Sequence, residues 1–285
     1  MKNKALIVGV GLMGASFAKG LQELGGYEVI GFDRDPSALE KGLSEGYLQE
    51  GYSSLDDIDF SEVKFVLSCL YPEDFVSFSK QLAPRLPKEA IVTEIAGVKG
   101  KMVFEAKKEF DRYGVHLLPS HPMAGGPSQG PALADSKLLK GRPYIVLPFE
   151  DTPQWAVDYL VSLGEKLGFS PISKLAVEEH DRLIAYISDL PHALAAAILM
   201  DLPEHLVATA GNSFRDFTRI ADFNVELWTR LFLLNADAVV EAGEKFQLSF
   251  GTLLNAIKEG DEEEIRRILE KAKKERGKLQ EVKKA

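Results

Sequence analysis

In the first 175 residues, short apolar runs rich in β-branched residues alternate with longer segments whose apolar residues recur every three or four positions. This alternation is typical of a parallel sheet covered by helices on both faces. The run Lys4–Val10 predicts the first buried strand, and Leu12–Leu24 predicts a helix that ends at Gly25 and Gly26. Further strands are predicted at Glu28–Asp33, Lys64–Cys69, Ala90–Glu94, Val115–Leu118, Tyr144–Pro148 and Ser170–Leu175. Helices are predicted after the N-cap Asp35 and near Glu73–Leu82, Gly100–Tyr113 and Pro153–Leu167.

From Val177 onward the strand signals stop and the apolar spacing is helical. Helices are predicted at Val177–Ser188, Pro191–Leu199, around Leu206–Ala221, and at Val225–Ala242, Leu248–Lys258 and Asp261–Val282. We place the domain boundary near Leu175–Ala176, which gives an α/β domain at 1–175 and an all-α domain at 176–285. A helical half of this size often buries its apolar faces against a second copy, which predicts a homodimer.

Composition narrows the class of protein. The chain is 45% hydrophobic and 27% charged, as globular proteins are. Its 34 Lys and Arg against 43 Asp and Glu give a net charge of −9, which disfavours a nucleic-acid partner because phosphate binding needs clustered cations. Cys69 is the single cysteine, and a chain without an internal disulfide fits a reducing compartment.

The N-terminus could be read as a targeting segment. Met1–Lys4 followed by Ala5–Val8 superficially resembles a secretory signal with a cleavage site at Ala15–Ala18, but three glycines interrupt the apolar stretch. No uninterrupted apolar run reaches the roughly 18 residues of a membrane span. We therefore expect a cytoplasmic protein without a membrane partner.

The interrupting glycines form a motif, because Gly9-Val10-Gly11-Leu12-Met13-Gly14 is GxGxxG placed between a predicted strand and a predicted helix. The first glycine permits the tight turn, the second lets a pyrophosphate approach the backbone, and the third lets the helix pack on the strand. The helix N-terminus then offers free N–H groups to the pyrophosphate. The alternative is that the glycines only make a sharp turn.

A carboxylate in the expected place supports the binding interpretation. Asp33 ends the second strand about 20 residues after Gly14, where an acidic residue accepts the ribose 2′-hydroxyl and repels a 2′-phosphate. This favours NAD over NADP, although the adjacent Arg34 leaves room for NADP. We expect residues 1–175 to form a Rossmann-type dinucleotide-binding domain.

A histidine follows another predicted strand, in the segment Leu118–Pro127. Ligands of open α/β sheets collect beyond the carboxyl ends of the strands, so we expect His121 to face the nicotinamide. Removing a hydride from an alcohol requires a base for the hydroxyl proton, which histidine can be at neutral pH. The alternative is a structural hydrogen bond. From the same loop we predict Ser120, Gly126 and Ser128 as substrate contacts, and the Gly- and Pro-rich stretch to Gly141 as a mobile lid.

The helical half contains a second polar cluster. Pro191, inside the helical stretch Ser188–His192, predicts a kink or a new helix start. Arg215 and Arg219 lie four residues apart, and either a substrate carboxylate or nearby acids such as Asp216 could balance their charges. A structural ion pair is the alternative. His116, His180 and His205 we interpret as structural.

These residues together resemble the prephenate/arogenate dehydrogenase family of tyrosine biosynthesis over nearly the whole chain. The resemblance rests on Gly9–Gly14, Gly97-Val98-Lys99-Gly100, His121–Gly125, His180-Asp181, Leu190-Pro191-His192 and Asp216–Ala221. The chain looks like the stand-alone form of this family. The sequence leaves no room for a fused chorismate mutase domain before Lys4 or for a regulatory domain after the last helix.

The resemblance implies a function and a set of roles. The family oxidatively decarboxylates a cyclohexadienol acid with NAD. By resemblance, His121 accepts the proton of the ring hydroxyl, Arg219 holds the ring carboxylate, and His192 shapes the substrate pocket. We also predict Asp189 and Asp216 as substrate contacts and Gly97 as a cofactor contact. The family's dimers interlock through the helical half. No metal is implied.

Two positions depart from the family pattern. A serine usually stands at Gly97, where its hydroxyl helps orient the catalytic histidine and the nicotinamide; here Ser120, Thr93 or a water would have to substitute. Histidine is frequent where Asp189 stands. A carboxylate at that position disfavours the keto-acid side chain of prephenate and can pair with the ammonium of arogenate.

We therefore expect an NAD-dependent prephenate dehydrogenase, with arogenate as an alternative or additional substrate. A β-hydroxyacid dehydrogenase is a second interpretation, since Gly11–Gly14 and a helical second half occur there too, but that group relies on a catalytic lysine. A non-catalytic, NAD-sensing module is a third interpretation.

Overall fold

The computed structural model describes residues 3–125 and 130–281. The chain divides into two compact units, one ending at Asn235 and one beginning at Ala236, and each is described by itself. Two of the predicted substrate contacts, Gly126 and Ser128, lie outside the described residues.

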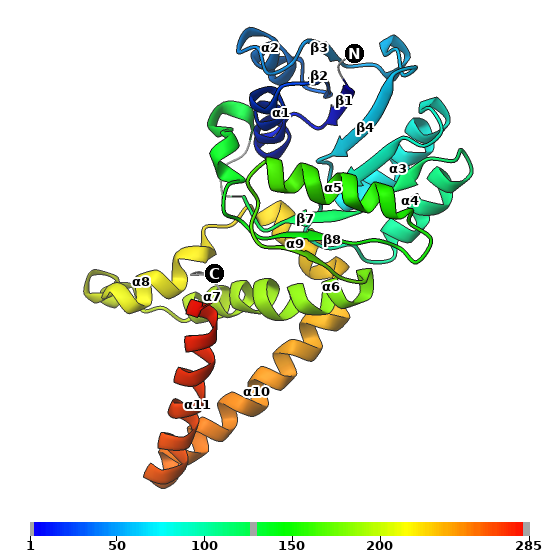
Figure 1. Ribbon diagram of the computed structural model, residues 1–285. Coiled ribbons are helices and arrows are strands. Elements are labelled where there is room, and N and C mark those ends of the chain that lie inside the picture. The colour runs from blue at the N-terminus through cyan, green and yellow to red at the C-terminus, as the bar shows by residue number, and fades with distance from the viewer. Residues whose placement is uncertain (1–2, 126–129, 282–285) are drawn as a thin grey trace. The chain divides into compact units, whose positions relative to one another are not determined.

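A six-stranded parallel sheet forms the centre of the first unit, in the order β3-β2-β1-β4-β5-β6 (Figure 1). Its strands are β1 (Asn3–Val8), β2 (Tyr27–Phe32), β3 (Glu50–Tyr52), β4 (Val63–Ser68), β5 (Ile91–Glu94) and β6 (His116–Leu117). Val8 pairs with Phe32 on one side and with Ser68 on the other, so the chain leaves all three strands at the same edge. The order reverses between β1 and β4, which is where ligands bind in open α/β sheets.

Helices cover both faces of this sheet, as the alternating pattern predicted. The helices are α1 (Leu12–Leu24), α2 (Pro36–Ser44), α3 (Pro72–Leu82), α4 (Met102–Asp111) and α5 (Gln154–Lys166). One apolar core joins one face of the sheet to α1 and α5, and includes Phe17, Leu21 and Leu160. A second core joins the other face to α3 and α4, and includes Phe78 and Phe110. The prediction of an α/β domain built on a parallel sheet is confirmed.

A second, three-stranded sheet consists of β7 (Ser120–Pro122), β8 (Tyr144–Val146) and β9 (Ile172–Lys174). The prediction that the chain segments of β8 and β9 continue the main sheet is wrong. One edge of β8 pairs antiparallel with β7 and the other edge pairs parallel with β9, so neither edge of β8 is paired with β6 of the main sheet. The sequence pattern also missed β3 and β7, which have only three residues each.

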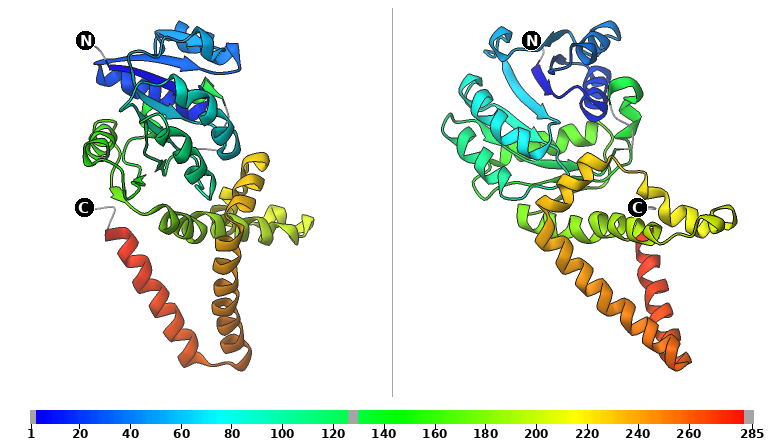
Figure 2. Two further views of the ribbon diagram at one scale, coloured as in Figure 1. Left: turned by 90° about the vertical axis from the view of Figure 1, so that its right-hand side faces the viewer. Right: turned by 180° about the vertical axis from the view of Figure 1, so that it is seen from behind.

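The helical part of the first unit begins with α6 (Val177–Ile184), a π-helical turn at Ala185–Asp189, and α7 (Leu190–Met200). Figures 1 and 2 show these three segments as one continuous rod. Pro191 was predicted to kink or restart the helix. A new α-helix does start there: α7 begins at Leu190, directly after the π turn, with Pro191 in its first turn, where proline is tolerated.

Shorter elements complete the unit: 3-10 helices at Glu204–Thr209 and Arg219–Ala221, and the helices α8 (Asn212–Thr218) and α9 (Val225–Leu234). The second unit consists of α10 (Ala236–Glu259) and α11 (Glu262–Glu281). The predicted helix Val225–Ala242 is wrong, since it breaks at Asn235, and α10 continues through the predicted gap before Leu248. Beyond Lys174 the described residues form only helices and turns, as predicted, while the boundary near Leu175–Ala176 stays a prediction.

Among the described residues, one helical segment, Val177–Met200, is long and apolar enough to cross a membrane, judged by length and composition only. Asp189 interrupts the apolar run in this segment, so the segment contains no uninterrupted apolar stretch of membrane-spanning length, although its mean hydropathy is high. Only 28% of its most apolar window is buried. Such a helix also suits an interface between protein chains, so the absence of a membrane partner stays a prediction.

Candidate active site

A cavity of about 980 Å³ opens at the edge of the sheet where β1, β2 and β4 end, and helical residues form its other wall. It brings together most of the residues singled out in the sequence. Those that line it are Gly9, Gly11, Leu12, Met13, Gly14, Asp33, Arg34, Gly97, His121, Asp189, His192 and Arg219. His121 from the sheet half and Arg219 from the helical half thus share one cleft.

The glycine turn has the backbone that its motif requires. Gly9 adopts φ +86°, which side chains rarely allow. A Cβ on Gly14 would lie 2.0 Å from the carbonyl oxygen of Gly9, so only glycine fits there, where α1 packs on β1. A Cβ on Gly11 would meet no atom within 4 Å, which leaves open space beside the N-terminus of α1. The turn can therefore receive a pyrophosphate on its backbone.

Asp33 is held at the end of β2 by two backbone groups. Its Oδ2 accepts the N–H of Val10, at 2.6 Å, and its Oδ1 accepts the N–H of Asp35, at 2.9 Å. These contacts fix the carboxylate beside the glycine turn, with lone pairs still available to a ribose hydroxyl. Arg34 is exposed at the same rim of the cavity.

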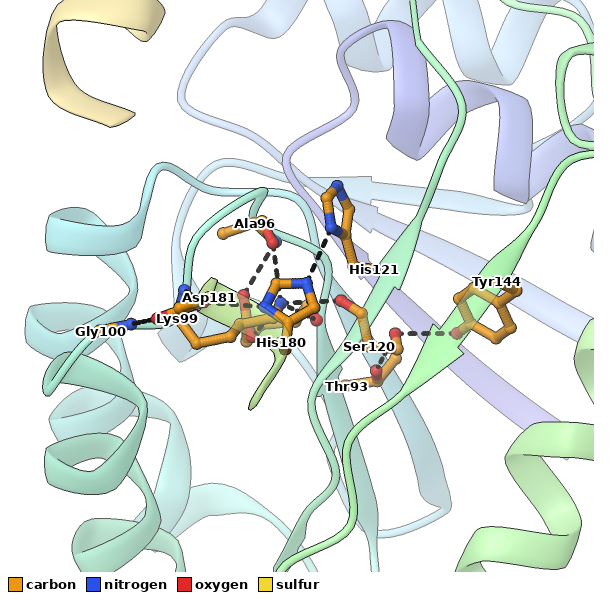
Figure 3. A network of polar contacts seen from close by, with 10 residues as sticks. Thr93, Ala96, Lys99, Gly100, Ser120, His121, Tyr144, His180 and Asp181 are labelled. Carbon is orange, nitrogen blue, oxygen red and sulfur yellow. Dashed lines mark hydrogen bonds and ion pairs between the residues drawn. The ribbon is translucent and has the colours of Figure 1, made fainter. Parts of the chain in front are cut away.

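His121 belongs to a chain of hydrogen bonds that runs from the cavity wall into the helical half (Figure 3). Its Nδ1 lies 2.9 Å from Nε2 of His180, and Nδ1 of His180 lies 2.8 Å from Oδ1 of Asp181. The Asp181 carboxylate also accepts the backbone N–H groups of Lys99, at 3.0 Å, and Gly100, at 2.7 Å. The carboxylate therefore fixes the orientation of both imidazole rings.

The direction of these bonds sets the tautomer of His121. A carboxylate only accepts, so His180 donates from Nδ1 and offers a bare Nε2, which accepts the Nδ1–H of His121. Nε2 of His121 is then left without a proton. Burial, together with the neighbouring His180 and Lys99, lowers the pKa of His121 well below its ordinary value. His121 is thus a neutral proton acceptor.

The pKa values of His180 and Asp181, which support His121, are shifted as well. Burial lowers the pKa of His180 despite its bond to Asp181. Burial raises the pKa of Asp181, but the hydrogen bonds from His180, Gly100 and Lys99 outweigh it and hold that pKa below its ordinary value. The relay is therefore a neutral histidine pair on an ionised carboxylate.

Asp189 presents a second buried carboxyl group to the cavity. Only 1% of the residue is exposed, and its Oδ2 accepts the side-chain N–H of Asn235 at 2.8 Å. The same amide donates to the backbone oxygen of Asp181, at 2.9 Å, so Asn235 joins α6 to the π turn. Burial raises the pKa of Asp189 to about 6. Its charge therefore depends on what the cavity binds.

His192 stands one turn beyond Ser188 on the same rod, and its ring stacks on Trp228 of α9 with ring centroids 3.7 Å apart. Its Nδ1 donates to the carbonyl oxygen of Ser188 at 2.8 Å, so Nε2 is the free ring atom. π-helical turns are frequent at functional sites, and this one lies where Ser188, Asp189 and His192 reach the cavity.

Arg219 lies in the 3-10 turn after α8, on the cavity wall. Among the carboxylates whose side chains the structure describes, none forms an ion pair with it. Arg219 caps α8, four residues after Arg215, which donates to the carbonyl oxygen of Ala210 and does not line the cavity. Arg219 is thus a cation available to an anionic ligand.

Two predicted substrate contacts do not reach the cavity. Ser120 is fully buried, and its hydroxyl bonds to Thr93 and Tyr144, because successive side chains of β7 point to opposite faces. Neither Ser120 nor Thr93 therefore substitutes for a serine at Gly97. Asp216 is exposed on α8 and does not line the cavity.

Sequence reasoning missed the residues that support His121. The sequence analysis interprets His180 as structural and gives no role to Lys99, nor to Trp228, which stacks on His192. The adjacent pair His180-Asp181 was the available signal, since a histidine beside a carboxylate is a common orienting arrangement.

Comparisons with known proteins agree over most of the chain. Residues 17–171 match the family model of the prephenate dehydrogenase nucleotide-binding domain, and residues 176–271 match that of the prephenate dehydrogenase dimerization domain. A cyclohexadienyl dehydrogenase of Zymomonas mobilis is 27% identical over 266 residues, which are 90% of this chain and 88% of that protein.

Solved structures of two further proteins are similar. Prephenate dehydrogenase from Aquifex aeolicus, in complex with hydroxyphenyl propionate and NAD+, is 30% identical with a TM-score of 0.88, over 98% of each chain. Synechocystis arogenate dehydrogenase is 27% identical with a TM-score of 0.85, over 97% of this chain and 99% of that one.

Proposed function

The chain belongs to the prephenate dehydrogenase family, and from this premise we propose that it is an NAD-dependent dehydrogenase that converts prephenate to 4-hydroxyphenylpyruvate by oxidative decarboxylation. The observation that carries the proposal is the convergence of His121 and Arg219 on one cavity that begins at the glycine turn. A β-hydroxyacid dehydrogenase or a sensing module would not need this pair.

The cavity suits NAD. The open space at Gly11 and the N-terminus of α1 receive the pyrophosphate, and Asp33 accepts a ribose hydroxyl. The Aquifex aeolicus relative holds NAD+ in its solved structure. When bound, NAD+ supplies the acceptor for the hydride.

His121 is the base of the proposed reaction. Its bare Nε2 accepts the proton of the ring hydroxyl as the hydride leaves the same carbon. The imidazolium that forms is stabilised by His180 and, through it, by Asp181. When the bond to the ring carboxylate breaks, its electron pair makes the ring aromatic, CO2 leaves, and the phenol oxygen takes the proton back.

Arg219 and His192 position the substrate in this proposal. The guanidinium fork of Arg219 matches the two oxygens of the ring carboxylate. His192, held flat against Trp228, forms an aromatic wall with a free Nε2 that can bond to the substrate side chain. Both residues come from the helical half, so the substrate bridges the two halves of the first unit.

A second substrate, arogenate, is favoured by one observation. Asp189 lines the cavity with a buried carboxyl group, and the ammonium of arogenate would give it an opposite charge that prephenate lacks. A cation within contact distance favours the ionised carboxylate and would lower its pKa from about 6.

We also propose that the protein is a cytoplasmic homodimer. A dimerization-domain model matches residues 176–271. Large apolar side chains on α7 and α9, such as Met200 (83% exposed) and Leu233 (73% exposed), lie on the surface of the single chain and would be covered by a second copy.

The decisive experiment measures NADH or NADPH formation by the purified protein with prephenate, arogenate or a 3-hydroxy acid, each with NAD+ and NADP+. We expect turnover of prephenate with NAD+. An Asp189→Asn variant should lose relative activity with arogenate while it keeps activity with prephenate. Hydride release from the 3-hydroxy acid alone, or cofactor binding without any turnover, would refute the proposal.

A further inference from the structure

Lys99 and Glu94 form a buried ion pair behind His121, and the proposed reaction gives neither of them a chemical step. Their side chains are 0% and 5% exposed. A buried ion pair is costly to desolvate, and apolar packing of the same volume is often at least as stable. Retention of both charges beside a reactive histidine therefore suggests a role beyond stability.

The ammonium of Lys99 is bonded on all sides. Nζ is ion-paired with the Glu94 carboxylate and donates to the backbone carbonyl oxygens of Glu94, at 3.4 Å, and of Ala96 and Ser120, each at 2.8 Å (Figure 3). These three carbonyl oxygens match the three N–H groups of an ammonium, so the full set of bonds requires the charged form. Because Ser120 directly precedes His121, the contact fixes the backbone from which the imidazole projects.

The backbone of the same residue holds the other end of the relay. The N–H of Lys99 donates to Oδ1 of Asp181, the oxygen that also accepts from His180. One residue thus contacts both the strand that carries His121 and the carboxylate that orients His180. These two segments are far apart in the sequence and come from different halves of the chain.

We propose that Lys99 is a positioning residue for the reaction, whose side chain fixes β7 at Ser120 while its backbone N–H fixes Asp181. This arrangement keeps His121 and His180 at hydrogen-bond distance with Nε2 of His121 facing the cavity. The proposal rests on the proposed function, because His121 must act as a base for its position to matter. After burial and the coulombic effect of His180, the charge of Lys99 is a further cause that lowers the pKa of His121.

Other ionisable groups surround His121 and must be kept constant in a test. They are His180 and Asp181 on α6, and Asp189, His192 and Arg219 on the cavity wall, in addition to Glu94 at the end of β5, which is substituted only together with Lys99. A substitution confined to Lys99 and its partner leaves the other five in place.

The test uses two variants of the full chain. Glu94→Gln with Lys99→Met removes both charges at similar volume, and Lys99→Gln is a milder change that keeps one donor. Lys101→Met, an exposed lysine on the same loop, is the control. The measurements are kcat, the KM values for NAD+ and for prephenate or arogenate, and the acid limb of the kcat/KM profile.

We expect kcat of the double variant to fall at least about tenfold, with KM values within about threefold, because misplacing a catalytic group affects mainly the chemical step. The acid limb of Lys99→Gln should move to higher pH, since this variant removes only the positive charge, and losing that charge makes His121 easier to protonate. Lys101→Met should behave like the wild type.

A fall in kcat without a shift of the acid limb would assign Lys99 a purely structural role and overturn the proposal, as would an unchanged kcat. If neither variant gives folded protein, Lys99 is needed for the loop to fold, and the proposal of a positioning role is overturned as well. An inactive wild type would instead refute the proposed function, so the two failures are distinguishable.

Discussion

Nδ1 of His121 and Nε2 of His180 lie 2.9 Å apart, and this contact joins β7 of the sheet half to α6 of the helical half. The bond forms between two segments that match different family models. Its geometry leaves the free nitrogen of His121 in the cavity. The reactivity of the proposed base therefore depends on how the two halves pack.

His121→Asn should remove the base while keeping a side chain of similar polarity. We expect kcat to fall by about 10²–10⁴, the usual contribution of general acid–base catalysis, with a small change in KM. Steady-state kinetics with prephenate and arogenate check this. His116→Asn, at a surface histidine that bonds to Glu89, is the matched control. Near-normal kcat/KM in His121→Asn would remove His121 from the mechanism.

The absence of a side chain at Gly97 leaves space beside the proposed base. A Cβ there would lie 3.8 Å from Nε2 of His121 and 3.6 Å from Leu231, both ordinary contacts. We expect Gly97→Ala and Gly97→Ser to keep kcat/KM within about tenfold of the wild type. Gly97→Leu should lower it by about 100-fold or more, because the larger side chain would occupy the position of the reacting hydroxyl.

Melting temperatures of the three Gly97 variants separate this steric effect from unfolding. If Gly97→Leu is as active as Gly97→Ala, the substrate does not approach Nε2 of His121 from this side.

Much of the nucleotide site could be predicted because its residues are contiguous in sequence. Gly9 to Gly14 have fixed spacing, and Asp33 follows from the length of one strand–helix–strand unit. The His121 relay could not be predicted, because its partners come from α6 and from the loop after β5. Ser120 was misplaced because β7 was not recognised as a strand, and its alternation turns Ser120 away from the cavity.

In the helical half, the residues at which one helix ends and the next begins were harder to predict than the helices themselves. A periodic apolar pattern continues through Asn235, where the structure ends α9, and through the π turn at Ala185–Asp189. Both features depend on tertiary contacts, such as the two hydrogen bonds of Asn235 to Asp181 and Asp189. Helical periodicity predicts that a segment is a helix more reliably than it predicts the residues at which the helix begins and ends.

Asp189→Asn should stabilise the protein in a pH-dependent way. The pKa of Asp189 in the fold is about 6, above its ordinary value, so its stabilising contribution is present at low pH and is lost as the pH rises through 6. Asparagine keeps an oxygen for Asn235 and has no charge to bury. The gain at about pH 8 should approach 3 kcal/mol at most and vanish near pH 4.

Thermal unfolding at both pH values measures this difference, with the exposed Asp201→Asn as control. An equal shift of the melting temperature at both pH values would show that Asp189 is not destabilised by its charge.

Asp33→Asn should relax the preference for NAD+. The amide oxygen can still accept the N–H of Val10, but the group no longer repels a 2′-phosphate, and the adjacent Arg34 can attract one. We expect the ratio of kcat/KM for NAD+ over NADP+ to fall at least about tenfold, which corresponds to roughly 1.4 kcal/mol. Asp57→Asn, at an exposed position, should leave the ratio unchanged. An unchanged ratio in Asp33→Asn would exclude Asp33 from cofactor selection.

Arg219→Gln should weaken substrate binding more than it slows chemistry. The guanidinium lines the cavity and pairs with none of the carboxylates whose side chains the structure describes, and a hydrogen bond to a charged group contributes about 1.5–3 kcal/mol. KM for the substrate should therefore rise by about 10- to 100-fold, while kcat changes by less than about threefold. Arg215→Gln is a close control, since Arg215 lies on α8 and bonds to Ala210 instead. If the two variants raise KM equally, the effect is one of overall charge, and Arg219 does not hold the substrate carboxylate.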